Sequence, residues 1–434
     1  MDVAPEDIGH LRGRDLGRLV SAARVLSRSG RKAWVRTRSG DPAVTSLAEE
    51  LKGGFERLGP TYVKLGQMVA STPALFPDAL VQGFQGCLDE VRPLSSETVH
   101  RVIAEELGAP ANEVFADIDD KPLASASIGQ VHRATLEGGK EVVVKVQRPA
   151  IADQISKDLR IMHLLARGAE RASRNARLAQ PIAVVEDFAV TLSEELSFMV
   201  EARSMEAVGE SLADFPDSKL IHIPAVEWRY TTPRVLTMEY VAGTRLDDVD
   251  ALVKAGTDPA GLLKVAVRGW LHGSLVHGVF HGDLHAGNLC VDPAGRVVFL
   301  DFGICGHLTE QARESLLLAL PALLSRDMRG VAAAIFESAS EKPIDMDTIT
   351  ADLERVVLPI FDQPLNEVSY AQAFVEVVRI GVRHGVLLPR DLILVFKQFF
   401  YVERFTRLLA PDWMPLMDPD IMQSVLLAQQ RHQG

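Results

Sequence analysis

The spacing of apolar side chains changes along the chain, and each spacing predicts a different kind of element. Between residues 53 and 108 apolar side chains recur every three to four positions, which predicts helices with one apolar stripe. Residues 131–136 and 141–147 are instead β-rich runs on either side of a glycine turn, which predicts an antiparallel hairpin. The stripe consists of Phe55, Leu58, Tyr62, Leu65 and Met68.

Further elements follow in the second half of the chain. Residues 235–241 have the pattern of a buried strand, and residues 259–278 that of a largely buried helix. Residues 289–291 and 296–300 are short strands separated by an Asp-Pro-Ala-Gly turn. Residues 309–430 form a helical region that prolines divide into segments. The pattern therefore predicts an α+β fold.

Residues that could bind a metal ion or act in catalysis lie on both sides of the second hairpin. Asp283 and Asn288 lie five positions apart, and Asp301-Phe302-Gly303 follows the hairpin. A hairpin of this length returns Asp301 to the side of Asn288, so that two oxygen ligands converge as Mg²⁺ requires. Asp283 would orient or deprotonate an acceptor hydroxyl. The order and spacing are those with which a kinase fold binds Mg-ATP and transfers its γ-phosphoryl group.

The first hairpin carries a lysine, Lys145, that could bind the phosphates of ATP. Lys145 lies in mid-strand among valines, where a charge is costly without a partner, so we expect phosphates and a helix glutamate to face it. Ala124-Ser125-Ala126-Ser127 occupies the place of a phosphate loop and should be stiffer than a glycine-rich one. The backbone around Glu239 and Val241 would meet the adenine. We therefore predict a two-lobed, protein-kinase-like fold.

These motifs resemble those of the UbiB-type atypical kinases, also called aarF-domain-containing kinases, over about residues 50 to 400. The family's K-x-G-Q motif matches residues 64–67, and its E-x-D motif falls on residues 195–197. The resemblance implies that Glu201 pairs with Lys145. It also implies that Glu195 pairs with Lys64 and holds the K-x-G-Q helix, which includes Gln67, over the active site.

Two positions depart from the family's pattern. Ser197 stands where the E-x-D motif has Asp, which removes a carboxylate that would help to hold the K-x-G-Q segment. Gly282 and Leu284 stand where the family usually has Ala and Pro. In this respect the loop resembles that of aminoglycoside- and choline-type phosphotransferases, which act on small molecules.

The resemblance implies an ATPase or small-molecule kinase that acts on or with an isoprenoid- or quinone-like ligand. Residues 301–310 hold no long activation segment and no Ala-Pro-Glu, which argues against a protein substrate. Two alternatives stay open. One is a phosphotransferase that modifies a natural product or drug, and the other is a nucleotide-gated ligand-binding regulator with little turnover.

The composition of the chain limits the kinds of partner, compartment and metal site that we expect. The 434 residues are 47% apolar, enough for packed cores, and the net charge of -12 argues against a nucleic-acid partner. The three cysteines show neither disulfide nor zinc spacing, which suits a reducing cytoplasm. No segment is long and apolar enough to predict a transmembrane helix. His277, His281 and His285 recur every four residues, but two of them lie in the catalytic loop, so we expect no metal besides Mg²⁺.

Residues 12–38 are strongly basic and carry apolar side chains at roughly helical spacing. Such a helix either lies on an anionic membrane or packs against the body of the protein. We place domain boundaries at 1–45 for this segment, 46–115 for the K-x-G-Q helices, 116–242 for an N-lobe with a helical insert, and 243–434 for the C-lobe.

Overall fold

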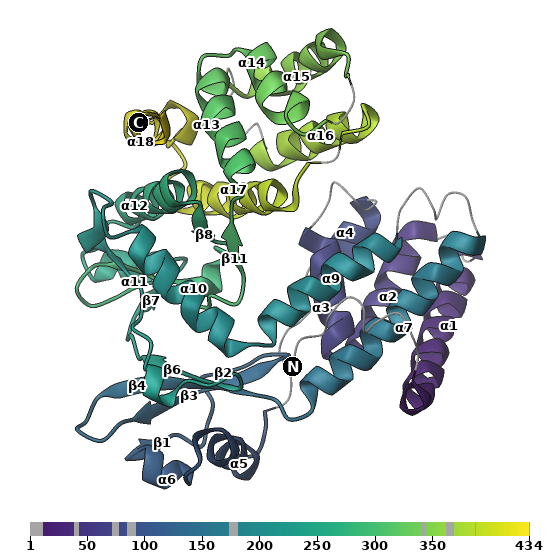
Figure 1. Cartoon of the computed structure of the whole chain (residues 1–434), viewed down its shortest axis with the longest axis vertical. Coiled ribbons are helices and arrows are strands. Elements are labelled where there is room, and N and C mark those ends of the chain that lie inside the picture. The colour runs from purple at the N-terminus through teal and green to yellow at the C-terminus, as the bar shows by residue number, and fades with distance from the viewer. Residues whose placement is uncertain are drawn as a thin grey trace. The chain divides into compact units, whose positions relative to one another are not determined.

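The computed structural model describes residues 12–38, 43–71, 78–84, 93–172, 181–340, 343–361, 369–386 and 388–433. The chain divides into two compact units, each built from helices and strands (Figure 1). The first comprises the described residues up to Val200 together with Val226–Tyr240. The second comprises Glu201–Ala225 and the described residues from Val241 onward. The α+β class expected from the sequence is confirmed.

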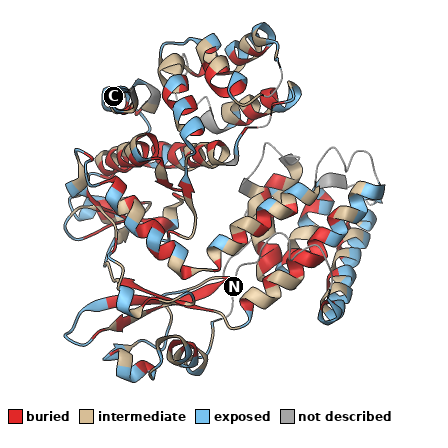
Figure 2. Cartoon of the chain, viewed as in Figure 1, coloured by how far each residue is buried: buried red, intermediate tan, exposed pale blue. Residues whose placement is uncertain are grey.

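The first unit contains an antiparallel sheet of order β1-β3-β4-β6, with β2 paired to β3. Both predicted strands of the first hairpin are present, and so is the predicted strand near residue 235. The strands are β1 (Asp117–Ile118), β2 (Ala124–Ser125), β3 (Gly129–Thr135), β4 (Glu141–Gln147) and β6 (Val235–Glu239). The valines of β4 share a buried core with helix α5 (Ser96–Leu107), which fixes the sheet on which Lys145 lies (Figure 2).

Helices form the rest of the first unit. They are α1 (Leu16–Arg38), α2 (Ala43–Leu58), α3 (Pro60–Ser71), α4 (Asp78–Phe84), α5, α6 (Ala111–Val114), α7 (Ile151–Ala172) and α9 (Pro181–Glu195). Contacts join α1 to α2 and α7, α2 to α3 and α4, and α7 to α9. The helical content expected between residues 53 and 108 is therefore present in the described part of that region.

The predicted single stripe is wrong in one respect, because the chain breaks between its second and third members. Gly59 has φ +96°, a conformation that glycine reaches freely, and α3 begins at Pro60. The two parts still meet, since the ring centroids of Phe55 and Tyr62 lie 5.6 Å apart. The stripe thus packs one short helix against the next.

Two buried ion pairs attach α1 and the residues before it to α7. Arg18 donates to both carboxylate oxygens of Asp158 at 2.7 and 2.8 Å, and the Thr61 hydroxyl donates to the same group at 2.8 Å. Arg160 donates to both oxygens of Asp15 at 2.7 and 2.9 Å. The Arg160 hydrogen bond holds the pKa of Asp15 at about 2, well below its usual range. The basic segment therefore packs on the protein body, as one of the two sequence interpretations expects.

The second unit contains a four-stranded sheet of order β5-β10-β9-β7 and a separate pair, β8 and β11. The predicted hairpin around the Asp-Pro-Ala-Gly turn is confirmed as β9 and β10. The strands are β5 (Ile221–His222), β7 (Thr244–Arg245), β8 (Val279–His281), β9 (Leu289–Val291), β10 (Val297–Phe299) and β11 (Cys305–His307).

Helices surround these strands. They are α10 (Phe198–Ser211), α11 (Val249–Lys254), α12 (Pro259–His272), α13 (Glu310–Leu324), α14 (Met328–Ala332), α15 (Met346–Phe361), α16 (Tyr370–Arg383), α17 (Arg390–Leu409) and α18 (Pro419–Gln433). The helix predicted over residues 259–278 is α12 followed by a π-helical turn, Gly273–His277. Among the described residues, no helix has both the length and the hydropathy needed to cross a bilayer.

Candidate functional site

The predicted catalytic loop begins where β8 ends, at His281. The ring is buried, with Nε2 3.0 Å from the Leu300 carbonyl oxygen and Nδ1 3.1 Å from the Asp283 amide nitrogen. A carbonyl only accepts and an amide N–H only donates, so Nε2 carries the proton and Nδ1 accepts. Burial is the largest influence on this ring and lowers the pKa of His281. Neutral His281 therefore ties the Asp283 backbone to the residue before Asp301.

Helix α17 holds the backbone on both sides of Asp283. The Gln398 side chain is fully buried, donates to the Gly282 carbonyl at 2.6 Å and accepts from the Leu284 amide at 3.0 Å. A proline at position 284 would have no N–H for this bond. The sequence departure at Leu284 thus has a local structural reason.

Gly282 has a similar reason. A Cβ added there would lie 2.9 Å from Ile304 Cγ2 and 3.2 Å from Leu394 Cδ2, closer than ordinary van der Waals contact. In this chain those two side chains take the space of the methyl group that an alanine would bring. Both departures in the loop therefore reflect how it packs.

The Asp283 carboxylate has two partners on α17. Its Oδ1 accepts from the Tyr401 hydroxyl at 2.9 Å and from Lys397 Nζ at 3.1 Å. Burial alone would raise the pKa of Asp283, but the charges of Lys397 and His285 and the Tyr401 hydrogen bond outweigh it and lower the pKa below its usual value. Asp283 is therefore an ionised group held by fixed donors, which suits orienting a hydroxyl better than removing its proton.

Sequence reasoning missed these partners. It predicts only a helical region around Lys397 and Tyr401, whereas the structure places the Tyr401 hydroxyl on Asp283. Burial and then the Asp283 charge raise the pKa of Tyr401, so the phenol stays protonated. The available signal was the four-residue spacing of Lys397 and Tyr401, which puts both polar groups on one face of the mostly apolar stretch 392–402.

Asn288 lies next to this loop. Its Nδ2 donates to the Asp283 carbonyl at 2.9 Å, and the Leu300 amide donates to the Asn288 carbonyl at 2.9 Å. The hairpin therefore brings the residue before Asp301 into contact with Asn288, as the sequence predicts. Because Nδ2 is engaged with the loop, the side-chain oxygen is the atom that could serve as a ligand for a hard cation.

Asp301 has a restrained backbone and an exposed position. Its φ is +54°, in the left-handed region that residues other than glycine rarely adopt. The next residue, Phe302, is buried, with its ring centroid 5.0 Å from that of His281. The same histidine therefore bonds to the Leu300 backbone before Asp301 and packs against the Phe302 ring after it, which restrains the Asp301 backbone in a conformation it would otherwise avoid.

In the first unit, Lys145 lies opposite Val131 and Leu236 in the sheet. Its Nζ is 5.2 Å from the centre of the Phe198 ring, a cation–π contact. A Cβ at Gly129 would lie 3.0 Å from the Val146 carbonyl oxygen and 3.2 Å from Phe198 Cζ, so this strand position favours a residue without a side chain.

In the Ala-Ser loop, Ala124–Ser125 forms β2, and Ala126 and Ser127 lie in the tight turn that leads from β2 to β3. Arg148 donates to the Ala126 carbonyl at 2.9 Å and to the Ser125 hydroxyl at 2.8 Å. These bonds fit the expectation of a stiff loop. The Ser127 hydroxyl is buried and has no hydrogen-bond partner among the described residues. A buried hydroxyl without a partner is costly, so a ligand that accepted its proton would be favoured here.

The predicted pairing of Lys64 with Glu195 is present. Lys64 Nζ lies 2.9 Å from Glu195 Oε2, and the side chains are 21% and 9% exposed. Gln67 lies one turn further along α3 and is half-buried. Ser197 follows the end of α9, at the position where the family's Asp is expected.

Glu201, Glu239 and Val241 would act together with residues of the other unit. Their predicted roles therefore stay predictions. Glu201 is buried in α10 but belongs to the second unit, whereas Lys145 belongs to the first. Glu239 ends β6 in the first unit, and Val241 opens the second. Their pairing and adenine contacts therefore rest on the sequence.

The sequence matches two family profiles. A profile described as an ABC1 atypical kinase-like domain matches residues 86–335, and one described as a UbiB helical domain matches residues 353–414. The chain belongs to the UbiB family of atypical kinases. The first match includes Lys145, Asp283, Asn288 and Asp301, and the second includes the part of α17 that carries Lys397 and Tyr401.

Comparison with individual proteins agrees with this family membership. An uncharacterised protein of Mycobacterium tuberculosis is 43% identical over 92% of this chain and 81% of its own length. A probable protein kinase UbiB of Marinobacter nauticus is 35% identical over 85% of this chain and 68% of its own length. A solved M. tuberculosis protein, in complex with erythromycin, has 23% identity and a TM-score of 0.50 over 82% of this chain and 92% of that one. At that identity the last likeness concerns the fold alone.

Proposed function

We propose that this UbiB-family chain binds Mg-ATP and either hydrolyses it or transfers its γ-phosphoryl group. The observation that carries the proposal is the bonding around His281. This neutral ring holds Asp283 and Leu300 together, while Asn288 bonds to both. These bonds fix the backbones of Asp283, Asn288 and the residue before Asp301 within one unit. Asp283, Asn288 and Asp301 are of the residue types that phosphoryl transfer needs.

The residues of the second unit would divide the work as follows. The Asn288 side-chain oxygen and the Asp301 carboxylate would hold Mg²⁺, which neutralises charge that develops on the phosphate oxygens. The ionised Asp283 would orient the attacking hydroxyl or water. Because Lys397 and Tyr401 both bond to Oδ1, its Oδ2 is the oxygen that we assign to this contact.

In the first unit, Lys145 would contact the phosphates and the buried Ser127 hydroxyl would donate to one of them. Glu201 would orient Lys145. The ion pair between Lys64 and Glu195 would hold α3, and with it Gln67, in position to regulate access.

We infer a small hydrophobic ligand rather than a protein as the partner in the reaction. From Asp301-Phe302-Gly303 the chain passes through β11 directly into α13, which leaves little length for a peptide-docking segment. The fold neighbour in complex with a macrolide antibiotic is consistent with small-molecule binding.

Two other functions remain as candidates. A phosphotransferase of the aminoglycoside- or choline-kinase type was suggested by Gly282 and Leu284, but the packing around both residues supplies another reason for them. A nucleotide-gated regulator with little turnover is the second. Phosphate found on a small acceptor would favour the first. Tight ligand binding unchanged in Asp283→Ala, with no turnover in either protein, would favour the second.

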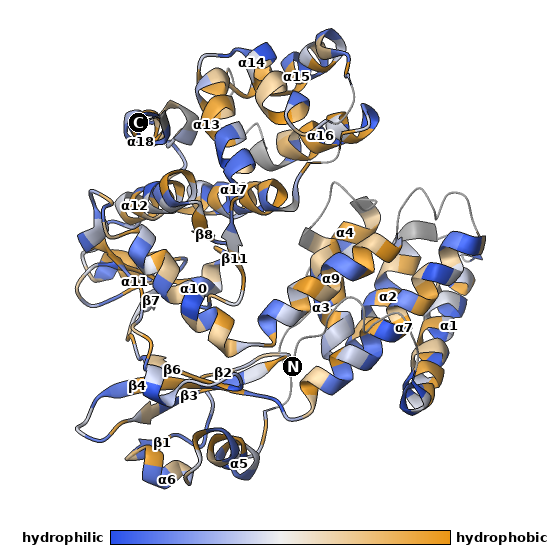
Figure 3. Cartoon of the chain, viewed as in Figure 1, coloured by the Kyte–Doolittle hydropathy of each residue, from blue (hydrophilic) through white to orange (hydrophobic). Residues whose placement is uncertain are grey.

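We also propose that α1 contacts an anionic membrane. Leu16, Val20 and Trp34 are 59%, 56% and 54% exposed, although α1 packs on the protein body through small residues on its other side (Figures 2 and 3). At 100° per residue these three fall on the same outward face as Arg24 and Arg31. Apolar and basic side chains that share one exposed face suit the interfacial layer of anionic lipids.

Vesicle flotation tests this contact. The wild type should float with phosphatidylglycerol vesicles and less with phosphatidylcholine, whereas Val20→Ser/Trp34→Ser should stay at the bottom. Leu426→Ser/Leu427→Ser is the matched control, since it removes two side chains of α18 that are 50% and 46% exposed. Equal flotation of all three proteins would rule out the α1 face.

The nucleotide site is tested by ATP affinity with and without Mg²⁺. We expect Mg²⁺ to tighten ATP binding to the wild type and to have little effect on Asp301→Asn, because one metal ligand is lost. Lys145→Met should weaken ATP binding in both conditions. ATP affinity that does not change with Mg²⁺ or with either substitution would overturn the assignment.

A further inference from the structure

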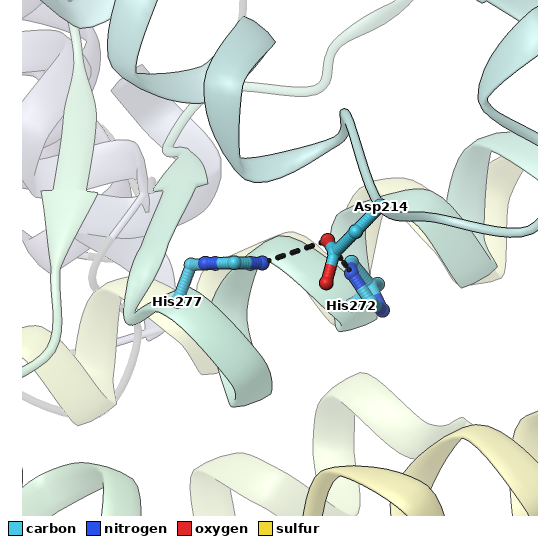
Figure 4. A group of neighbouring side chains, drawn as sticks. All are labelled: Asp214, His272 and His277. Atoms are coloured by element: carbon cyan, nitrogen blue, oxygen red, sulfur yellow. Dashed lines mark hydrogen bonds and ion pairs between the residues drawn. The ribbon is translucent and has the colours of Figure 1, made fainter. Parts of the chain in front are cut away.

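A second group of ligand-type side chains lies outside the catalytic loop. Asp214 follows α10, His272 ends α12, and His277 ends the π-helical turn, all within the second unit (Figure 4). Asp214 Oδ1 lies 2.8 Å from His272 Nε2 and 2.9 Å from His277 Nε2. Among the described residues, this is the group of three whose ligand atoms all lie within 4.8 Å of one another.

The π-helical turn is what brings the two histidines together. Residues five apart in an α-helix differ by about 140° in direction and do not face each other. The wider turn Gly273–His277, closed by a bond from the Gly278 amide to the Gly273 carbonyl, removes this offset. The two rings consequently lie with centroids 5.5 Å apart. π-Helical turns of this kind often occur at functional sites.

The close approach also requires a glycine. A Cβ at Gly273 would lie 2.8 Å from the Val279 carbonyl oxygen and 3.0 Å from the Ser211 hydroxyl. Helix α12 and the end of α10 can therefore meet only because position 273 has no side chain. This meeting places Asp214 over the two histidines.

The donor set suits a borderline divalent ion. Two imidazole nitrogens and one carboxylate oxygen form a common three-ligand set for Zn²⁺, with a fourth position left for water. Bonds of about 2.0–2.1 Å in tetrahedral geometry place ligand atoms roughly 3.3 Å apart. The present separations of 2.8 and 2.9 Å need to widen by only a few tenths of an ångström.

Three donors fix the Asp214 carboxylate. His272 and His277 both bond to Oδ1. Arg431 of α18 bonds to Oδ2, the oxygen that the histidines do not use. It orients the carboxylate, and its positive charge also opposes a cation on Oδ1.

We propose that Asp214, His272 and His277 form a site for a divalent transition-metal ion of the Zn²⁺ type, independent of the nucleotide site. The ion takes the place of the two Nε2 protons that lie between the imidazoles and Oδ1. A neutral ring then carries its proton on Nδ1, a charged ring releases one proton to solvent, and water completes the coordination. It joins the end of α10 to the end of α12. Helix α12 also carries Trp270, whose indole N–H donates to the His281 carbonyl at 3.0 Å. The metal therefore braces the helix that supports the start of the catalytic loop.

Titration of the full chain with Zn²⁺ against a chromophoric chelator tests this site. We expect one ion per wild-type chain and at least about a hundredfold weaker binding by His277→Gln, since loss of an outer partner alone costs 10- to 100-fold. His277 is 36% exposed, so this variant should fold. His100→Gln, on α5 of the first unit, is the matched control and should bind as the wild type does.

A charge variant gives an independent direction. Asp214→Asn removes the charge of the carboxylate ligand and keeps its size, so Zn²⁺ should bind at least about tenfold weaker. Zn²⁺ should also raise the Tm of the wild type and of His100→Gln but not that of His277→Gln. Equal Zn²⁺ affinity of the wild type and His277→Gln, or of the wild type and Asp214→Asn, would overturn the proposal.

Discussion

At the residue scale, the proposed phosphoryl transfer depends on how side chains fix the loop around Asp283. His281, Gln398 and Tyr401 each bond to it from a different direction. Gly282 is the position where packing leaves no space for even a methyl group. The loop is therefore restrained before any ligand binds, which is the condition for efficient phosphoryl transfer.

Gly282→Ala should destabilise the second unit. The added methyl meets Ile304 and Leu394, and overpacking of this kind costs roughly 1–3 kcal/mol in free energy of unfolding. Denaturant unfolding measures the change. Gly168→Ala in α7 is the control, because nothing lies within 4 Å of its added Cβ and alanine favours a helix. Equal stability of Gly282→Ala and the wild type would contradict the packing argument.

Tyr401→Phe should change the pH dependence of ATP turnover. The lost hydrogen bond is one of the interactions that lower the pKa of Asp283, so this pKa should rise toward its usual value. Activity that needs the ionised carboxylate is lost as pH falls through that pKa, and the acidic limb of the profile should therefore move to higher pH. Tyr230→Phe, at a tyrosine of the first unit, serves as the control. A limb that stays in place in Tyr401→Phe would show that Asp283 does not set it.

At the element scale, ion pairs hold the helices of the first unit to one another. Asp15 and Asp158 attach α1 to α7, and Lys64 attaches α3 to α9. Pairs of this kind are costly to break when they are buried and contribute little when they are exposed. The three attachments should therefore respond to substitution according to their burial.

Asp15→Asn should lower the free energy of unfolding near neutral pH by roughly 3 kcal/mol, because the buried ion pair between Asp15 and Arg160 is lost. The Asp15 pKa is lowered to about 2, so its contribution is complete above pH ~4 and is lost as pH falls toward 2. The variant should consequently lose less stability than the wild type over that range. Asp117→Asn, on an exposed residue of β1, is the control. Parallel acid unfolding curves for wild type and Asp15→Asn would contradict this.

A double-mutant cycle tests the K-x-G-Q pair. Lys64→Met, Glu195→Gln and the double variant should give a coupling energy of roughly 1–3 kcal/mol in unfolding, as expected for a largely buried pair. The cycle for Arg329 and Asp347, whose side chains are 65% and 84% exposed, should give less than about 1 kcal/mol. Equal coupling in both cycles would mean that burial of the Lys64 pair has no energetic effect.

At the scale of the whole molecule, the sequence predicts what depends on local period and on motifs. The strands around Lys145 and the hairpin before Asp301 follow from alternation and turn residues, and the pairing of Lys64 with Glu195 follows from the family resemblance. Membership of the UbiB family follows in the same way from the motifs.

What the sequence could not predict depends on distant contacts. Lys397 and Tyr401 lie more than a hundred residues after Asp283 and have the spacing of an ordinary packed helix. The helix break at Gly59 interrupts an apolar period that continues on both sides. The meeting of His277 with His272 depends on a π-helical turn, which changes the angle between residues without a marked change in composition.

The most direct test of the central claim is ATP turnover with Mg²⁺ in the wild type and in Asp301→Asn, with and without anionic vesicles. We expect the wild type to turn over ATP only with Mg²⁺. The rate should fall by roughly a hundredfold or more in Asp301→Asn, because a metal ligand is lost. Asp347→Asn, which changes a carboxylate that is 84% exposed, should retain wild-type turnover. A wild type with no Mg²⁺-dependent turnover, or an Asp301→Asn variant that turns over ATP as fast as the wild type, would contradict it.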